Sequence, residues 1–148
     1  MKIVLNKCYG GFSLSHEAQM RIFEKRGVKV FPYFSKWEDG DTFYKKYDSE
    51  KQKKSSLLDF VVYFKEDPQV DSFCIKESEK DKYDSIYLEF DHDRTNKELI
   101  DVVEEMGEKA NGRYAYLKVV EIPDGASYEI SDYDGIETAH YGFQTGSV

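Results

Sequence analysis

Cysteine is scarce in this sequence, and so are long apolar runs. Only two of the 148 residues are cysteines, Cys8 and Cys74. Two are too few for a structural zinc site, and a reducing cytosol would keep both as thiols. No apolar stretch approaches the ~18 residues that a membrane helix needs, and the first residues lack the apolar core of a secretory signal. We therefore expect a soluble intracellular protein without disulfides and without a membrane partner.

Basic residues are absent from the last part of the chain. Residues 121–148 carry six acidic side chains and no Lys or Arg. Residues 1–54 hold 12 basic and 7 acidic side chains (net +5), whereas residues 55–148 hold 9 and 22 (net −13). Because nucleic-acid backbones avoid acidic surfaces, we expect no nucleic-acid partner. The basic run at residues 45–54, with tyrosines nearby, is interpreted as a solvated loop, and a phosphate-binding patch is the alternative.

Apolar and aromatic residues are plentiful, at 40% and 16% of the chain. That content supports one domain with a core and is too small for two ordinary ones, so we expect a single domain over residues 1–148. The periodicity predicts an α+β (or α/β) fold, with a mixed or antiparallel sheet of five to six strands and two main helices. Residues 35–57 are largely hydrophilic and are predicted to form a flexible aromatic and basic insertion.

Local patterns predict where the elements lie. Strands are expected at residues 2–8, 28–31, 60–64, 72–75, 85–90, 114–122 and 128–130, with the end of a helix as the alternative at 60–64.

Turn and capping residues predict how these elements begin and end. Ser13 or Ser15 would cap a first helix that ends at Arg26-Gly27. Thr95 would cap the second helix, through the capping-box spacing Thr95-Asn96-Lys97-Glu98. A Pro-Asp-Gly turn at 123–125 would join strands 114–122 and 128–130 into a hairpin.

The loop Gly10-Gly11-Phe12-Ser13 is a candidate anion site, because it joins an expected strand to an expected helix. Amide groups at a helix N-terminus bind phosphate readily. The loop lacks the Gly-x-Gly-x-x-Gly spacing and the Lys-Ser/Thr of a P-loop. A tight turn with positive-φ glycines and a serine cap is the competing interpretation. Tyr9, Phe12 and Tyr133 are turn aromatics suited to stacking on a purine.

The segment Asp91-His92-Asp93-Arg94 follows an expected strand and is the candidate polar cluster. In an extended chain Asp91 and Asp93 share a face while His92 points away, so at most two of the three would ligate one ion. A solvated acidic turn with Arg94 paired to a neighbouring carboxylate is favoured, and no metal or other cofactor is expected. Arg94 is also suited to hold a phosphate or carboxylate, because guanidinium groups bind bidentately.

Histidine offers little support for catalysis in this chain. Neither His16 nor His140 has a Ser or Cys partner at a motif spacing, so no catalytic residue is assigned. His16 falls in the first turn of the first expected helix, where the helix dipole disfavours an imidazolium, and we expect it to be neutral. Enzymatic activity is left uncertain, and a non-catalytic role is favoured.

Three stretches of the chain carry a family resemblance: KIVLNKCYGGFSLS at 2–15, LIDVVEEMGEKAN at 99–111 and LKVVEIPDGASYEISDYDGIE at 117–137. Together they resemble a family of small, mostly uncharacterised proteins of tailed phages and prophages. The resemblance covers the two ends of the chain and leaves out the middle, residues 32–82. It implies no established activity. It implies a phage protein in the cytoplasm of a bacterial host, where small accessory proteins often counter host defences.

Three functional hypotheses follow from these patterns. In the first, a phage accessory protein binds and sequesters a nucleotide-derived small molecule to counter host defence. Its ligand-binding residues would be Tyr9, Gly10, Gly11, Phe12, Ser13 and Arg94. The alternative is an acidic interaction module that binds a host protein directly, and the third hypothesis is a metal-dependent hydrolase that uses Asp91 and Asp93. The oligomeric state is left open, a homo-oligomer included.

Overall fold

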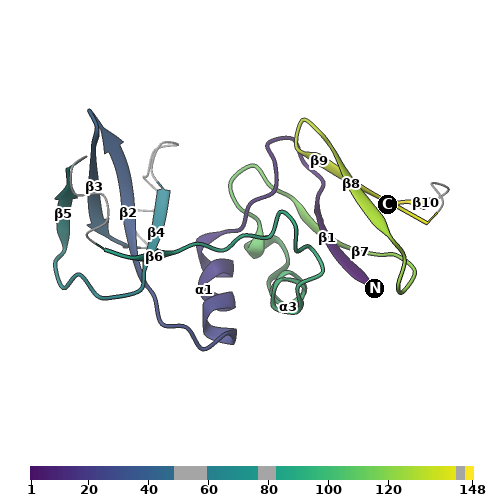
Figure 1. The fold of residues 1–148 in the computed structure, drawn as a ribbon, viewed down its shortest axis with the longest axis horizontal. Coiled ribbons are helices and arrows are strands. Elements are labelled where there is room, and N and C mark those ends of the chain that lie inside the picture. The colour runs from purple at the N-terminus through teal and green to yellow at the C-terminus, as the bar shows by residue number, and fades with distance from the viewer. Residues whose placement is uncertain (49–59, 77–82, 143–145) are drawn as a thin grey trace. The chain divides into compact units, whose positions relative to one another are not determined.

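The structure, a computed structural model, describes residues 1–48, 60–76, 83–142 and 146–148. The chain divides into two compact units: unit 1 is formed by Met1–Gly27 and Glu89–Val148, and unit 2 by Val28–Leu88. As predicted, the fold is α+β, and the described residues form two α-helices and three antiparallel sheets (Figure 1). No helix in the described part of the chain is long and apolar enough to cross a membrane.

Unit 1 contains two small antiparallel sheets. In the first, β1 (Lys2–Asn6) pairs with β7 (Leu117–Glu121). The second has the strand order β10-β9-β8, with β8 (Tyr128–Tyr133), β9 (Ile136–Tyr141) and β10 (Gly146–Ser147). The N-terminal strand is therefore completed by a partner from the far end of the sequence.

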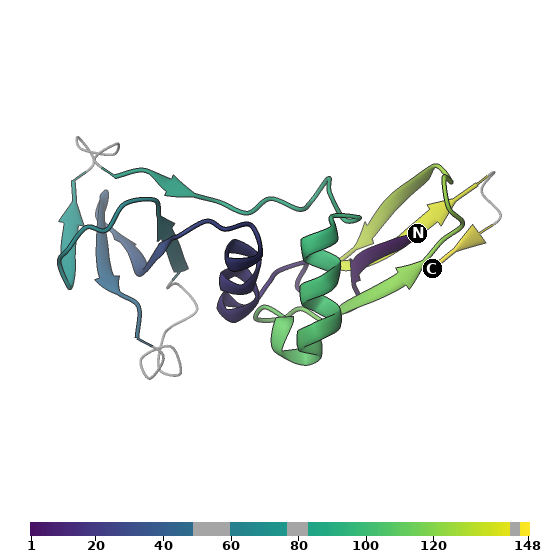
Figure 2. The same cartoon turned by 90° about the horizontal axis from the view of Figure 1, so that it is seen from below.

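The two sheets of unit 1 share an apolar core. Its buried members are Ile3, Leu5, Ile122 and Ala139. Met1 and Val148 pack against this core, and the two ends of the chain lie close together (Figure 2). Apart from Lys2 at its start, every residue of β1 is buried, as expected for a strand covered on both faces.

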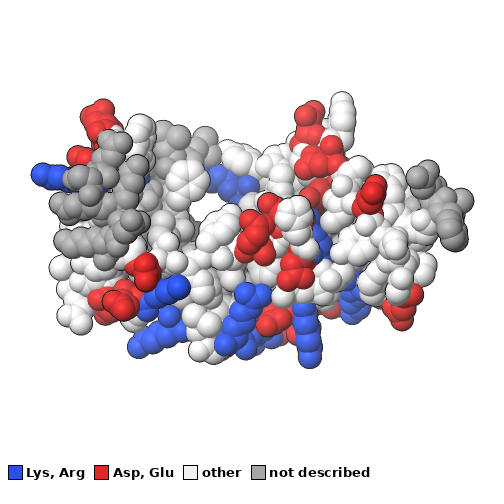
Figure 3. Space-filling view, viewed as in Figure 1, with Lys and Arg blue, Asp and Glu red and all other residues white. Residues whose placement is uncertain are grey.

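The two helices of unit 1 lie side by side in both views (Figures 1 and 2). α1 (His16–Lys25) begins as predicted, because the Ser15 side chain accepts a hydrogen bond from the Ala18 amide. α3 (Lys97–Met106) is followed by the 3₁₀ turn η2 (Gly107–Ala110). The Glu105 carboxylate on α3 forms ion pairs with two residues of α1, Arg21 (Nε to Oε2, 3.3 Å) and Lys25 (Nζ to Oε1, 2.7 Å). Basic and acidic side chains are accordingly mixed where the helices lie (Figure 3).

The predicted cap of the second helix was wrong by one residue. Asn96, not Thr95, is the N-cap of α3, and its Oδ1 accepts a hydrogen bond from the Leu99 amide at 3.1 Å. Asn96 Nδ2 also donates to Asp93 Oδ2 at 3.1 Å, which orients the cap. Asparagine is a better N-cap than threonine, so the stronger of two adjacent candidates sets the helix start.

The predicted hairpin between strands 114–122 and 128–130 was also wrong. β7 pairs with β1, from Lys2↔Glu121 to Asn6↔Leu117, and β8 pairs with β9 instead. Asp134 and Gly135 connect β8 to β9 with φ values of 50° and 95°. Positive φ at both central residues is the signature of the type I′ turn that favours tight hairpins, and this signal outweighs the turn at 123–125.

Unit 2 is a five-stranded antiparallel sheet with the order β5-β3-β2-β4-β6. The strands are β2 (Phe31–Glu38), β3 (Asp41–Lys46), β4 (Phe60–Phe64), β5 (Ser72–Ile75) and β6 (Ser85–Ile86). The start and end of β4 and β5 agree with the sequence prediction.

One face of the unit 2 sheet carries an aromatic core. Tyr33 and Phe64 are each only 2% exposed. Their rings meet edge to face at 5.5 Å, and the Tyr44 ring stacks on Phe73 at 4.9 Å. Aromatic pairs in these geometries add stabilisation beyond the area they bury.

The segment 35–57, expected to be an insertion, contributes regular strands to this sheet. Its residues 35–38 belong to β2 and residues 41–46 form β3, whereas residues 49–57 lie outside the described residues. The expected strand at 28–31 begins only at Phe31, and of the strand expected at 85–90 only Ser85–Ile86 is formed. Average polarity obscured an alternation in which Tyr33 and Tyr44 face the core while Lys36 and Lys45 lie on the opposite face of the sheet.

Candidate functional site

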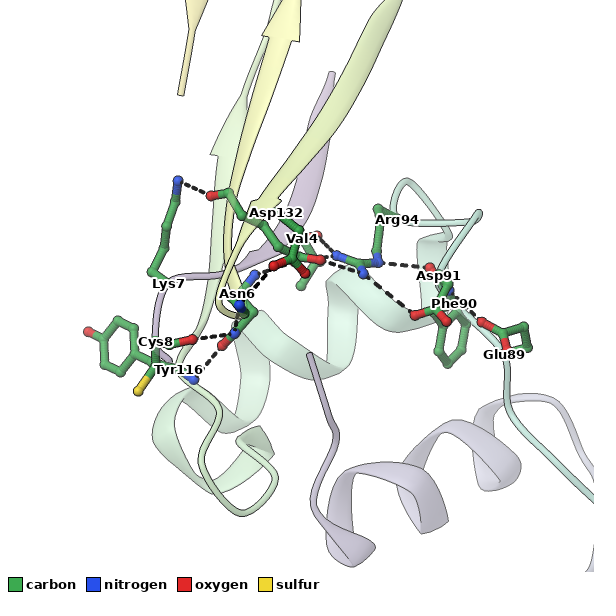
Figure 4. A network of polar contacts seen from close by, with 12 residues as sticks. Val4, Asn6, Lys7, Cys8, Glu89, Phe90, Asp91, Arg94, Tyr116 and Asp132 are labelled. Carbon is green, nitrogen blue, oxygen red and sulfur yellow. Dashed lines mark hydrogen bonds and ion pairs between the residues drawn. The ribbon is translucent and has the colours of Figure 1, made fainter. Parts of the chain in front are cut away.

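A buried ion pair lies at the centre of unit 1. Arg94 and Glu137 are each only 4% exposed. Nη1 of Arg94 donates to Oε1 of Glu137 at 2.5 Å and Nη2 donates to Oε2 at 2.8 Å, so the pair is bidentate (Figure 4). Arg94 Nε donates to the Phe90 carbonyl at 2.9 Å. The guanidinium thus holds a carboxylate, the type of anion that the sequence predicted for it, but from a residue 43 positions away.

The same ion pair covers the free edge of β1. The Asn6 amide donates to Glu137 Oε1 at 2.7 Å, and the Val4 amide donates to the Arg94 carbonyl at 3.0 Å. Buried strand edges need partners for their amide and carbonyl groups. Arg94 and Glu137 therefore take the place that a further strand would have on this side of β1.

Asn6 is the third buried polar residue of the network. Its Nδ2 donates to the carbonyls of Cys8 at 2.7 Å and Gly135 at 2.6 Å, and its Oδ1 accepts from the Tyr116 amide at 2.9 Å. These bonds connect the end of β1 to the β8–β9 turn and to the segment before β7. No buried side-chain nitrogen or oxygen of the described residues lacks a hydrogen-bond partner, as expected for a network that fixes a structure.

The candidate anion loop packs against the β8–β9 turn. Gly10 and Gly11 have φ values of 118° and 95°, as the tight-turn interpretation expects. The Gly10 amide donates to the Asp134 carbonyl at 3.2 Å, and a Cβ on Gly135 would lie 2.3 Å from the Gly11 nitrogen. Phosphate binding by this loop stays a prediction. In the structure the backbone of Gly10 and Gly11 contacts the backbone of the β8–β9 turn.

Ser13 and Phe12 also make contacts within the unit. The Ser13 carbonyl accepts from the Gly112 amide at 3.0 Å, while the neighbouring Ser15 caps α1. The Arg94 guanidinium lies 4.0 Å from the centre of the Phe12 ring, a cation–π contact. The fold therefore brings Phe12 and Arg94 together, as the ligand hypothesis requires, but in contact with each other.

The acidic segment before α3 is exposed at Asp91, His92 and Asp93. Asp91 Oδ1 lies 3.7 Å from Arg94 Nη2, a weak addition to the Glu137 pair. Asp93 bonds to the cap residue Asn96. Among residues 1–48, 60–76, 83–142 and 146–148, no group of three or more His, Cys, Asp or Glu side chains could hold a metal ion.

Four exposed tyrosines gather around the Gly10–Gly135 contact, and we call them the tyrosine surface: Tyr9, Tyr114, Tyr116 and Tyr133, at 61%, 60%, 50% and 72% exposure. A Cβ on Gly10 would lie 2.6 Å from Tyr114 Cβ, and the Lys7 amide donates to the Tyr116 carbonyl at 2.8 Å. Tyr133 precedes Asp134, the partner of Gly10. Figure 4 shows Tyr116 on the outer side of the buried network.

Sequence reasoning identified Tyr9 and Tyr133 as turn aromatics and missed Tyr114 and Tyr116. Both were included in an expected strand, but β7 begins only at Leu117. Tyr114 has a φ of 68°, an unusual conformation for a residue with a bulky side chain. Its position after Asn111-Gly112 was the available signal, because that pair breaks the preceding helix.

Charges of both signs border the tyrosine surface. Arg113 is exposed and makes no ion pair or hydrogen bond within the described part of the chain. Asp132 and Asp134 are exposed at the β8–β9 turn, where Asp132 Oδ1 accepts from the Gly135 amide at 2.7 Å. The guanidinium group of Arg113 and the carboxylates of Asp132 and Asp134 therefore lie close to exposed aromatic rings.

Comparison with known proteins adds no family to this geometry. Asn6, Arg94 and Glu137 form the buried network, and the tyrosine surface is the exposed feature that this network supports. No protein-family model, no curated protein and no solved structure matches the chain.

Proposed function

We propose that the protein binds a nucleotide-derived small molecule on the tyrosine surface. The observation that carries the proposal is the gathering of four tyrosines, each at least half exposed, around one contact between two loops. Exposed aromatic groups that cluster mark binding sites more often than isolated ones do. Tyrosine presents a large flat ring with little rotamer entropy to lose, and a stacked base contributes about 1–3 kcal/mol per ring.

The charges beside the rings fit the rest of a nucleotide. Arg113 is exposed and free to pair with a phosphate, which guanidinium groups bind bidentately. The exposed carboxylates of Asp132 and Asp134 are acceptors of the kind that bind ribose hydroxyls. Base, phosphate and sugar would then each meet a group suited to it within a short stretch of surface.

The proposal changes the roles expected for five of the six ligand-binding residues. Tyr9 stays a stacking residue. Gly10, Gly11, Phe12, Ser13 and Arg94 become supports, because their polar groups or rings already contact residues of the same unit. A support held by a fully bonded network keeps the tyrosines in place before a ligand arrives, which lowers the entropic cost of binding.

The biological role extends the family resemblance. A phage accessory protein that captures such a molecule in the host cytoplasm would lower its free concentration and so counter a defence that uses it as a signal. Capture needs affinity and abundance rather than chemistry, so the role requires no catalytic residue.

A second candidate function is direct binding of a host protein along β8. This strand lies at the edge of its sheet, and Glu129, Asp132 and Tyr133 on it are exposed. Edge strands can accept a further strand from a partner. The acidic side chains would then select a basic peptide.

The test is a titration of the whole protein with a panel of cyclic nucleotides and ADP-ribose derivatives, followed by calorimetry and by NMR of the tyrosine rings. We expect Tyr114→Ala and Arg113→Ala to weaken binding about five- to a hundredfold. Matched controls are Tyr87→Ala, 82% exposed in unit 2, and Lys118→Ala, exposed on β7. Both controls should bind as the parent protein does.

Two results would overturn the small-molecule proposal. One is a panel in which no compound shifts the tyrosine signals while native mass spectrometry after incubation with bacterial lysate retains a protein; loss of that complex in Glu129→Lys would favour β8. The other is equal weakening by Tyr114→Ala and its control Tyr87→Ala, which would place the ligand elsewhere.

A further inference from the structure

Arg113 and Tyr114 form the centre of a tight turn between η2 and β7. The turn runs from Gly112 to Ala115, and the Ala115 amide closes it by donating to the Gly112 carbonyl at 3.1 Å. Tyr114, the third residue of the turn, has a φ of 68°. Turns with a positive φ at the third position favour glycine or asparagine there, because the Cβ of most other residues crowds the backbone. The backbone of Tyr114 is therefore strained.

The other residues with positive φ differ from Tyr114 in the type of side chain. In the described part of the chain, Asp39, Gln69, Tyr114 and Asp134 are the residues other than glycine with positive φ. Asp39 and Asp134 each precede a glycine in the turn of a β-hairpin. Aspartate is enriched in this conformation, because its short side chain can bond to the nearby backbone, whereas a bulky residue there is an outlier. A tyrosine ring is thus unusual at such a position.

Contacts on both sides keep the turn in this conformation. The Gly112 amide donates to the Ser13 carbonyl at 3.0 Å, and a Cβ on Gly112 would lie 2.2 Å from Ser13 Oγ. A Cβ on Gly10 would lie 2.6 Å from Tyr114 Cβ and 2.9 Å from the Tyr114 carbonyl oxygen. Strained residues persist where the surrounding structure determines their conformation. Two glycines allow the neighbouring loop to pack this closely against the turn.

The ring of Tyr114 contributes little to the fold. It is 60% exposed. Among the residues that the structure describes, its hydroxyl group makes no hydrogen bond and its ring stacks on no other aromatic ring. Glycine or asparagine at this position would form the same turn with less strain. Because strained backbone is concentrated at ligand-binding positions, the exposed ring is the feature that explains why the strain is retained.

We infer that Tyr114 is the residue of the tyrosine surface on which the base of the ligand stacks, and that the ligand is a nucleotide whose phosphate pairs with Arg113. This assignment rests on the proposed function of the tyrosine surface and specifies its ligand. Neighbouring Cα atoms are ~3.8 Å apart, so one turn carries the ring and the exposed guanidinium. A base and a phosphate on the same ribose match this pair. A turn that is fixed before the ligand arrives lowers the entropic cost of binding.

Thermal unfolding separates backbone strain from packing of the ring. Tyr114→Asn removes the ring and accepts the positive φ, whereas Tyr114→Ala removes the ring and keeps the strain. We expect Tyr114→Asn to melt at least as high as the parent protein and about 2 °C or more above Tyr114→Ala. Tyr116→Asn and Tyr116→Ala are the matched controls, because Tyr116 is 50% exposed and its φ is not positive. At that position asparagine should give no advantage over alanine.

Calorimetric titration with cyclic AMP, ADP-ribose and adenosine tests the assigned contacts. Tyr114→Asn should weaken the binding of all three compounds about fivefold or more, because the stacked base loses its ring. Arg113→Ala should weaken cyclic AMP and ADP-ribose about tenfold or more, and should leave adenosine, which has no phosphate, unchanged. Tyr87→Asn removes a tyrosine that is 82% exposed in unit 2 and should bind all three compounds as the parent protein does.

The results that would overturn the inference differ from those that would overturn the proposed function. The inference alone is wrong if Tyr114→Asn melts no higher than Tyr114→Ala, or if Arg113→Ala weakens adenosine as much as ADP-ribose. It is also wrong if Tyr114→Asn binds as the parent protein does while Tyr9→Ala or Tyr133→Ala loses binding. If none of the compounds binds the parent protein, or if none of the tyrosine variants weakens binding, the proposed function is wrong and the inference with it.

Discussion

Unit 1 and unit 2 hold their strands together in different ways. In unit 1, β1 pairs with a strand more than 100 residues later in the chain, and its other edge is covered by the side chains of Arg94 and Glu137. In unit 2, β2 and β3 form a tight hairpin, and every strand of the sheet lies within residues 31–86. Unit 1 therefore depends on distant polar contacts, and unit 2 on local pairing and aromatic packing.

The two units are expected to differ in how strongly a single substitution destabilises them. A buried network whose members share partners loses several bonds when one member is removed, because the remaining groups stay buried and unpaired. Aromatic packing is spread over several rings, so the loss of one ring leaves the others in contact. We expect unit 1 to respond to single substitutions more sharply than unit 2 does.

The largest effect is expected from Glu137→Ala. It leaves the Arg94 charge buried without its partner and removes the acceptor of the Asn6 amide. Breaking a buried ion pair costs about 3–5 kcal/mol. Hydrogen exchange followed by mass spectrometry should show strong loss of protection in β1 and β7, while β2 and β4 retain theirs.

Two further variants check the cause of that loss. Glu129→Ala removes an exposed glutamate from β8 and should be nearly neutral. The double variant Arg94→Met/Glu137→Leu should be milder than Glu137→Ala, since it leaves no buried charge unpaired. Equal loss of protection in both units would instead show that they unfold together, which would contradict the expected difference in their sensitivity to substitution.

Phe64→Ala is the corresponding change in unit 2. Phe64 is 2% exposed and its ring contacts those of Tyr33, Tyr44, Phe73 and Tyr83. Large-to-small changes of this kind cost about 3 kcal/mol or more. The single tryptophan, Trp37, lies on β2, so its fluorescence during urea unfolding reports on this unit. A midpoint unchanged from that of the parent protein would contradict the assigned core.

Gly135→Ala is expected to have a smaller effect. Its added Cβ would approach the backbone nitrogens of Gly11 and Gly10 at 2.3 and 2.7 Å, at a φ of 95°. Gly125→Ala is the matched control, because its φ is also positive, at 76°, yet nothing lies within 4 Å of the new Cβ. Strain from the backbone alone is about 1–2 kcal/mol. Thermal unfolding should therefore show a larger loss for Gly135→Ala, and an equal loss would mean that the loop moves away freely.

The cap of α3 gives a further prediction of modest size. Asn96→Ala removes the acceptor of the Leu99 amide and should destabilise the protein by about 1 kcal/mol. Thr95→Ala, one residue earlier, should be close to neutral. The two urea midpoints decide between the cap in the structure and the cap that the sequence predicted.

Local signals explain which parts of the fold were predictable. Ser15 and Gly27 mark the ends of α1 with a capping side chain and a positive φ of 69°, and the apolar run of β4 is continuous in sequence. Contacts between residues that are far apart in the sequence have no comparable local signal. Nothing near Arg94 indicates Glu137, and nothing near β1 indicates β7, because these contacts depend on how finished elements pack.

The candidate site was predictable only in part, for the same reason. Tyr9 and Tyr133 were recognised because each sits beside a glycine turn. Tyr114 and Tyr116 look like one side of a strand until β7 is seen to start after them. Arg94 was recognised as a residue that grips an anion, but the anion belongs to the protein itself.

The smallest expected effects concern pH, and they differ in sign between the units. Burial lowers the pKa of His16 at the start of α1, with Glu17 opposing the shift. In unit 2, burial raises the pKa of Tyr33, and the charge of Asp67 adds to the shift. The lowered pKa of His16 favours its neutral form, which is the form expected from its helix position, and the raised pKa of Tyr33 favours its protonated form.

Linkage gives the direction of each effect. Below about pH 6.5 the unfolded chain takes up a proton at His16 that the folded unit 1 resists, so the stability of unit 1 falls with acidification until the folded pKa is passed. Above about pH 10 the unfolded chain releases the Tyr33 proton that the folded unit 2 retains, so the stability of unit 2 falls as pH rises. Hydrogen exchange at several pH values should show β1 losing protection first in acid and β2 first in base. His16→Gln should flatten the acid response and Tyr33→Phe the alkaline one; if either variant leaves its response unchanged, other groups govern it.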